Sequence, residues 1–156
     1  MDFLKQIFQT NPSIIKIGFE DIKIVIEKTR INSNEYIIIN TMPDTFQMNL
    51  ISGTINALTE ESIINNILDN YEMKHKKIVL YGLNIIDETV EKKAKQLQTL
   101  GFSEIFIYYS GMFEWLLLQE VYGHDEFPTT EKIQSIDILK YRPRKILDIL
   151  QINSLL

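Results

Sequence analysis

The sequence predicts an α/β fold: a single domain in which a parallel sheet of about four or five strands has helices on both faces. Three short, continuously apolar runs are typical of strands buried on both sides, and they span residues 36–40, 77–81 and 104–108. Segments with helical spacing separate these runs, an alternation that favours parallel pairing. The chain of 156 residues is about one domain long and shows no repeat or linker.

The first elements are a helix and a strand. Residues 20–28 are predicted to be an amphipathic helix, because Ile22, Val25 and Ile26 recur at helical spacing among charged residues. A polar turn follows, and the apolar run at 36–40 is the first buried strand.

The middle of the chain repeats this alternation. Thr59 is predicted to cap a helix that runs to about Tyr71, with two glutamates in its first turn. The strand at 77–81 comes next and is expected to be central in the sheet. Asp87 is then expected to cap a helix over 88–100, with Leu100 among its inward residues.

The last part of the chain contains one more strand and helical segments. The strand at 104–108 is followed by a helix over 113–121. A short helical segment is expected near 133–139, and an apolar segment at 144–156 follows a break at Pro143. The apolar residues of this last segment could pack back on the sheet domain, which we favour, or dock on another chain.

Composition excludes several classes of function. The net charge of −5, from 21 acidic and 16 basic residues, argues against a nucleic-acid partner. There is no cysteine, so disulfides and thiolate chemistry are excluded. His75 and His124 are far apart, without metal-ligand spacing, and we expect neither a metal nor a cofactor.

The same composition gives an expected location. No apolar run reaches the roughly 18 residues of a membrane span, and the first residues lack the pattern of a secretion signal. These features predict a cytoplasmic protein. The abundance of Ile, Asn and Lys is typical of an AT-rich genome. It suggests the hypothesis of a large DNA virus, with the protein in the host cytoplasm or associated with the virion.

Five segments share an order and spacing along the chain. They are Ile-Gly-Phe-Glu-Asp-Ile at 17–22, Tyr-Ile-Ile-Ile-Asn at 36–40, Leu-Ile-Ser-Gly-Thr-Ile-Asn-Ala at 50–57, Lys-Ile-Val-Leu-Tyr-Gly at 77–82, and Leu-Gly-Phe-Ser-Glu-Ile at 100–105 with Gly111 and Trp115. Together they resemble the rhodanese-like domain over residues 17–123. The resemblance implies an N-terminal extension at 1–16 and a C-terminal extension with an apolar helix at 124–156.

The resemblance also locates a degenerate active-site loop. In active members of the family this loop reads Cys-x-x-Gly-x-Arg-Ser, and its cysteine becomes a persulfide. The matching residues here are Gly82, Leu83, Asn84, Ile85, Ile86, Asp87 and Glu88. Glycine stands at the nucleophile position and Asp87 at the arginine position, so thiosulfate sulfurtransferase activity is not expected. Carboxylates at the start of a helix also oppose an anionic substrate, so Gly82→Cys alone is not expected to restore activity.

We therefore expect a non-catalytic protein-binding or structural module with a neutral to acidic, partly apolar loop surface. The side chains that could contact a partner are Leu83, Ile85, Ile86, Met112, Leu155 and Leu156. Two interpretations stay open for Ile85 and Ile86: they fill the vacated pocket as core, or one remains exposed as an anchor. The alternative function is an enzyme of unfamiliar chemistry that uses Asp87 or Glu88.

Overall fold

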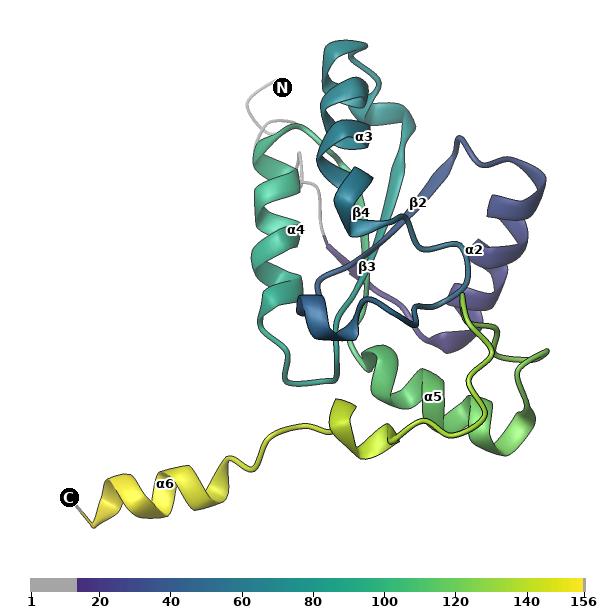
Figure 1. Ribbon diagram of the computed structural model, residues 1–156. Coiled ribbons are helices and arrows are strands. Elements are labelled where there is room, and N and C mark those ends of the chain that lie inside the picture. The colour runs from purple at the N-terminus through teal and green to yellow at the C-terminus, as the bar shows by residue number, and fades with distance from the viewer. Residues whose placement is uncertain (1–13, 156) are drawn as a thin grey trace, which may run out of the picture.

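The computed structural model describes residues 14–155 and shows a four-stranded sheet of order β1-β4-β3-β2 (Figure 1). The strands are β1 (Ile15–Lys16), β2 (Tyr36–Asn40), β3 (Lys77–Tyr81) and β4 (Glu104–Tyr108). All three pairings are parallel. The three predicted strands are confirmed, and β3 lies inside the sheet as expected. The additional edge strand, β1, has two residues, too few for a pattern to reveal.

Helices cover both faces of this sheet. These covering helices are α2 (Phe19–Ile31), α3 (Ala57–Asp69), α4 (Thr89–Thr99) and α5 (Gly111–Tyr122), and a further helix, α6, spans Leu147–Ser154. Short 3₁₀ turns occupy Asp44–Phe46, Met73–His75 and Ile138–Tyr141. The buried side chains of α2 and α5 pack on one face of the sheet, and those of α3 and α4 pack on the other. Within residues 14–155, no helix combines the length and the apolar character that crossing a membrane requires.

The two layers of the core follow from the alternation of side chains along each strand. On the α2 and α5 side, β2 and β3 contribute Ile38, Val79 and Tyr81. On the α3 and α4 side, the same strands contribute Ile37, Ile39, Ile78 and Leu80. Both sets are buried, which explains why these strands are apolar at consecutive positions.

Several local predictions are corrected. Asn56, and not Thr59, caps α3, because its side-chain oxygen accepts a hydrogen bond from the Leu58 N–H at 2.8 Å. Leu100 is exposed at the end of α4, although its spacing predicted an inward position. The segment expected near 133–139 forms a 3₁₀ turn slightly later, at Ile138–Tyr141.

The chain after α5 returns to the core before it leaves the body. Phe127 and Tyr141 are buried, and Thr129 forms an antiparallel bridge with Ile51. The Trp115 indole N–H donates to the Pro128 carbonyl at 3.2 Å. The domain boundaries at 16/17 and 123/124 stay predictions, although β1 and this returning segment both join the folded body.

Helix α6 lies apart from the rest of the molecule (Figure 1). Ile149 and Leu150 are exposed, and Leu147 and the following Leu155 retain 74% and 87% of their accessible surface. The favoured interpretation, that this segment packs back on the sheet domain, is therefore wrong. Leu156 lies outside the described residues.

Candidate functional site

The degenerate loop leaves the carboxyl end of β3, the edge where parallel α/β sheets present ligand sites. Residue 81 fixes the start of this loop. The buried Tyr81 hydroxyl accepts from the Ile51 N–H at 3.0 Å and lies 2.9 Å from the Thr54 hydroxyl. Burial raises the pKa of Tyr81 well above its usual range, so the hydroxyl is neutral at physiological pH. Tyr81 is a structural anchor for the loop.

Gly82 has no room for a side chain. A Cβ atom at this position would overlap the Asp87 carboxylate and lie 2.8 Å from a Val90 methyl group. The position that the resemblance assigns to the nucleophile is therefore occupied by a neighbour's carboxylate. This contact supports the expectation that Gly82→Cys alone does not create an active loop.

Asp87 connects the loop to the start of α4. Its Oδ2 accepts from the Leu83 N–H at 2.9 Å, and its Oδ1 accepts from the Thr89 N–H at 3.0 Å and the Thr89 hydroxyl at 2.6 Å. The helix predicted over 88–100 spans Thr89–Thr99, and Glu88, not Asp87, occupies its N-cap position. Asp87 lies one residue earlier, where its carboxylate still accepts the first N–H of α4 and also the Leu83 N–H. An internal carboxylate thus uses N–H groups that could otherwise hold an external anion.

The start of α5 closes the other side of the loop. The Met112 and Phe113 N–H groups donate to the Gly82 and Leu83 carbonyls, each at 2.9 Å. Gly111 permits this approach, because its φ is +65° and a Cβ there would lie 2.5 Å from the Gly82 oxygen. Met112 is completely buried behind this contact. Its expected role in contacting a partner is therefore wrong, since the side chain presents no surface.

The apolar residues of the loop differ in exposure. Ile85 retains 56% of its accessible surface, whereas Leu83 and Ile86 are half-buried. The interpretation that Ile85 fills the vacated pocket is wrong. Asn84 is buried instead: its amide donates to the Tyr141 carbonyl at 3.0 Å, and its oxygen accepts from the Ile86 N–H at 3.2 Å. This residue fixes the loop against the C-terminal segment.

Two arginines complete the surface around the loop. Arg142 and Arg144 line a shallow cavity of about 370 Å³ together with Leu83, Asn84, Ile86, Asp87 and Glu88. Two acidic and two basic side chains line it, so its formal charge sums to zero, and the two arginines are the part that the sequence prediction did not include. The basic run Lys-Tyr-Arg-Pro-Arg-Lys at 140–145 was the available signal, but only the fold brings it beside a loop more than 50 residues earlier.

Within residues 14–155, the hydrogen bonds of the Asp87 carboxylate serve the loop and the start of α4, and the Glu88 side chain makes no capping bond. In the part of the chain that the structure describes, no group of three or more His, Asp or Glu side chains could hold a metal ion. The hypothesis of an enzyme that uses Asp87 or Glu88 stays a prediction.

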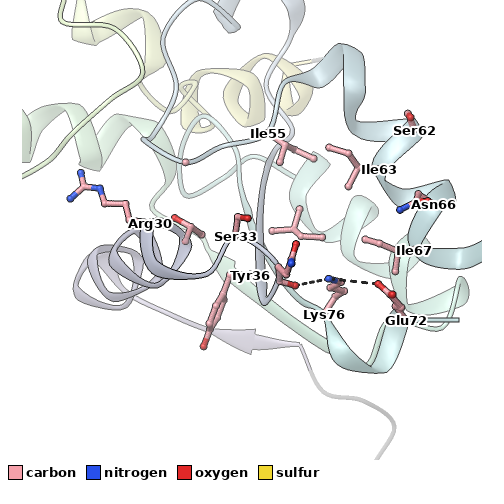
Figure 2. Close-up of a pocket in the computed structure, with 14 residues that line it drawn as sticks. Arg30, Ser33, Tyr36, Ile55, Ser62, Ile63, Asn66, Ile67, Glu72 and Lys76 are labelled. Carbon is pink, nitrogen blue, oxygen red and sulfur yellow. Dashed lines mark hydrogen bonds and ion pairs between the residues drawn. The ribbon is translucent and has the colours of Figure 1, made fainter. Parts of the chain in front are cut away.

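A larger cavity, of about 810 Å³, lies between α2, β2 and α3 (Figure 2). Ile55, Ile63 and Ile67 line one side of it. The Lys76 amine donates to the Asn34 carbonyl at 2.6 Å and lies 3.7 Å from a Glu72 oxygen. These charged groups satisfy one another, so the loop at the end of β3 remains the candidate site.

Comparison with known proteins gives matches among solved structures. No protein-family model matches the sequence, and a search of curated proteins finds no significant match. The BH2092 protein from Bacillus halodurans is 17% identical, with 78% of this chain and 79% of that chain covered and a TM-score of 0.50. The rhodanese-like domain of the Alr3790 protein from Anabaena sp. is 19% identical, with coverages of 69% and 97% and a TM-score of 0.47. An uncharacterized protein from Saccharomyces cerevisiae is also 19% identical, with coverages of 67% and 92% and a TM-score of 0.49.

These likenesses concern the fold. The α/β fold class predicted from the sequence, with its parallel sheet and helices on both faces, is confirmed. The absence of cysteine means that this chain cannot carry out the cysteine-dependent sulfur transfer of active rhodanese-like domains.

Proposed function

We propose that this chain is a non-catalytic rhodanese-like domain that binds a protein partner through the surface around its degenerate loop. This loop surface consists of Leu83, Ile85, Ile86, Arg142 and Arg144. The observation that carries the proposal is the position of the Asp87 carboxylate. It takes the place of a side chain at residue 82 and uses the Leu83 and Thr89 N–H groups. The loop is filled from within, while Ile85 remains exposed.

The chemistry of this surface suits a protein better than a small anion. Ile85 offers an apolar anchor, with the half-buried Leu83 and Ile86 beside it and the exposed arginines at the rim. Arginine at the edge of an apolar centre favours a partner with acidic residues around an apolar contact. We therefore expect the affinity for the partner to fall as salt is raised.

Capture of partners from the native source tests this proposal. The full chain should retain a specific protein, and Ile85→Asp should weaken its binding by about 2 kcal/mol or more, because the charge enters the centre of the contact. The pair Arg142→Ala/Arg144→Ala should reduce the salt dependence of the affinity.

The matched control is Ile31→Asp, which introduces the same charge at an exposed isoleucine at the end of α2. This end of α2 leads into the amino end of β2. It therefore lies at the amino ends of the parallel strands, whereas the loop lies at their carboxyl ends. A partner that binds wild type and both loop-surface variants equally would contradict the proposal. A virion-associated structural role and a viral origin stay hypotheses, and the native source would test them as well.

A further inference from the structure

Two kinds of exposed side chain lie in the C-terminal arm, residues 144–155, and directly before it. Helix α6 stands away from the body (Figure 1). Ile146, Leu147, Ile149 and Leu150 retain 43%, 74%, 46% and 55% of their accessible surface. Aliphatic side chains on an isolated helix end are costly in water, which indicates that this helix has an apolar environment when it functions.

The segment before α6 is strongly basic. Lys140, Arg142, Arg144 and Lys145 lie within six residues and are all exposed. Among residues 14–155, no ion pair involves the first three, and Lys145 pairs with Asp148 of the same arm at 3.6 Å. The whole chain has a net charge of −5, so this cluster is an exception to the balance of charge elsewhere.

The two kinds of side chain follow one another along the chain. At about 3.6 residues per turn, Ile146, Leu147, Ile149 and Leu150 fall within about half of the circumference at the start of α6, and Asp148 projects from the other half. Asn153 and Ser154 of the last turn lie on the same half as the aliphatic residues. Asp148 is the acidic residue of α6, and it pairs with Lys145. The aliphatic start of α6 therefore has cations directly before it.

The size of α6 restricts what can cover it. Its eight residues form a helix of about 12 Å, and two such helices bury far less than the roughly 1,200 Å² of a specific protein interface. A second copy of this chain could not be held by α6 alone. A lipid surface needs no matching groove, and it accepts a short apolar side when cations add a second attraction.

We propose that the C-terminal arm binds the surface of membranes that contain anionic lipids. The aliphatic side chains of α6 enter the boundary between head groups and acyl chains. Lys140, Arg142, Arg144 and Lys145 meet the lipid phosphates and carboxylates. We expect both interactions to be needed. A short apolar helix partitions only weakly into a membrane, and salt screens the attraction between a few exposed cations and anionic lipids.

Sedimentation of the full chain with vesicles tests the inference. Vesicles of phosphatidylcholine mixed with phosphatidylserine should bind the protein, and vesicles of phosphatidylcholine alone should not. Lys140→Glu/Lys145→Glu should weaken binding about tenfold or more, since each cation near an anionic surface contributes several-fold to the affinity. Leu147→Asp/Leu150→Asp should weaken binding by a similar factor, and added salt should weaken the binding of wild type.

Two controls separate this inference from the proposed function. Lys92→Glu/Lys95→Glu makes the same charge change at exposed lysines of α4, and it should leave vesicle binding unchanged. Lys140 and Lys145 do not line the cavity at the loop, so their variant should retain a partner captured there. No binding to either vesicle, or equal binding to both, would overturn the membrane inference. Retention of an acidic protein by α6 in the absence of vesicle binding would assign the arm to a protein groove instead.

Discussion

Gly82 and Asp87 form one unit, because each residue explains the other. Glycine leaves a space above the end of β3, and the Asp87 carboxylate enters it to accept the Leu83 N–H. A side chain at residue 82 would displace that carboxylate, and an apolar residue at 87 would leave two N–H groups without their acceptor. The pair is coupled through contact, so changes at the two positions should not have additive effects on stability.

Asp87→Ala should lower the free energy of unfolding by about 0.5–2 kcal/mol, the cost of losing a helix cap. The bond to Leu83 places the expected value toward the upper part of this interval. Chemical denaturation measures the change. Glu88→Ala is the matched control: it removes the neighbouring carboxylate, which makes no capping bond, and should change stability by less than about 0.5 kcal/mol. Equal losses in the two variants would contradict the assigned role of Asp87.

Among the secondary-structure elements, the strands that are buried on both faces were the ones whose limits the sequence predicted correctly. Strands β2, β3 and β4 are buried on both faces, so their apolar runs stand out and their limits are predicted correctly. The two-residue edge strand β1 has no such pattern.

Arg142 and Arg144 were missed at the loop for a different reason. Their position depends on how the segment after α5 crosses the molecule. A hydrogen bond from the Asn84 amide to the Tyr141 carbonyl holds this segment beside the loop.

The connection between β3 and the segment before α3 depends on the Tyr81 hydroxyl. Tyr81→Phe should lower the free energy of unfolding by about 1–3 kcal/mol, because the buried Ile51 N–H loses its acceptor. The contribution of the Tyr81 hydroxyl to the free energy of unfolding of the wild-type protein should also depend on pH. Burial raises the pKa of Tyr81 in the folded state, so its stabilising effect is complete below the unfolded value of about 10 and declines as the pH rises above it.

Unfolding of both proteins between about pH 8 and 11 checks this prediction. The loss of stability at alkaline pH should be smaller in Tyr81→Phe than in wild type. Tyr122→Phe, at an exposed tyrosine of α5, should match wild type at every pH. An alkaline loss of the same size in all three proteins would show that Tyr81 is not the responsible group.

The whole molecule consists of a packed body and an arm that leaves it. The body does not end with α5, because Phe127 and Tyr141 enter the core that α2 and α5 share. The segment that carries them supplies carbonyl acceptors to Trp115 and Asn84. In the described residues after Pro143 the chain makes no comparable contribution, since Leu147, Ile149 and Leu150 remain exposed. Of the last 30 residues or so, those up to Pro143 therefore contribute to the stability of the body, and those after it are available for a function at the surface.

Two truncations test this separation. A chain that ends after Pro143 should keep its free energy of unfolding within about 0.5 kcal/mol of wild type, because the described side chains that it loses, Leu147, Ile149 and Leu150 among them, are exposed. A chain that ends after Gly123 should lose cooperative unfolding, because it lacks Phe127, Tyr141 and the acceptor of the buried Trp115 indole. Urea denaturation followed by the fluorescence of Trp115 measures both. A loss of more than about 2 kcal/mol in the longer truncated chain would mean that α6 packs on the body in solution. Its aliphatic side chains would then belong to the core and would not be free for a lipid surface.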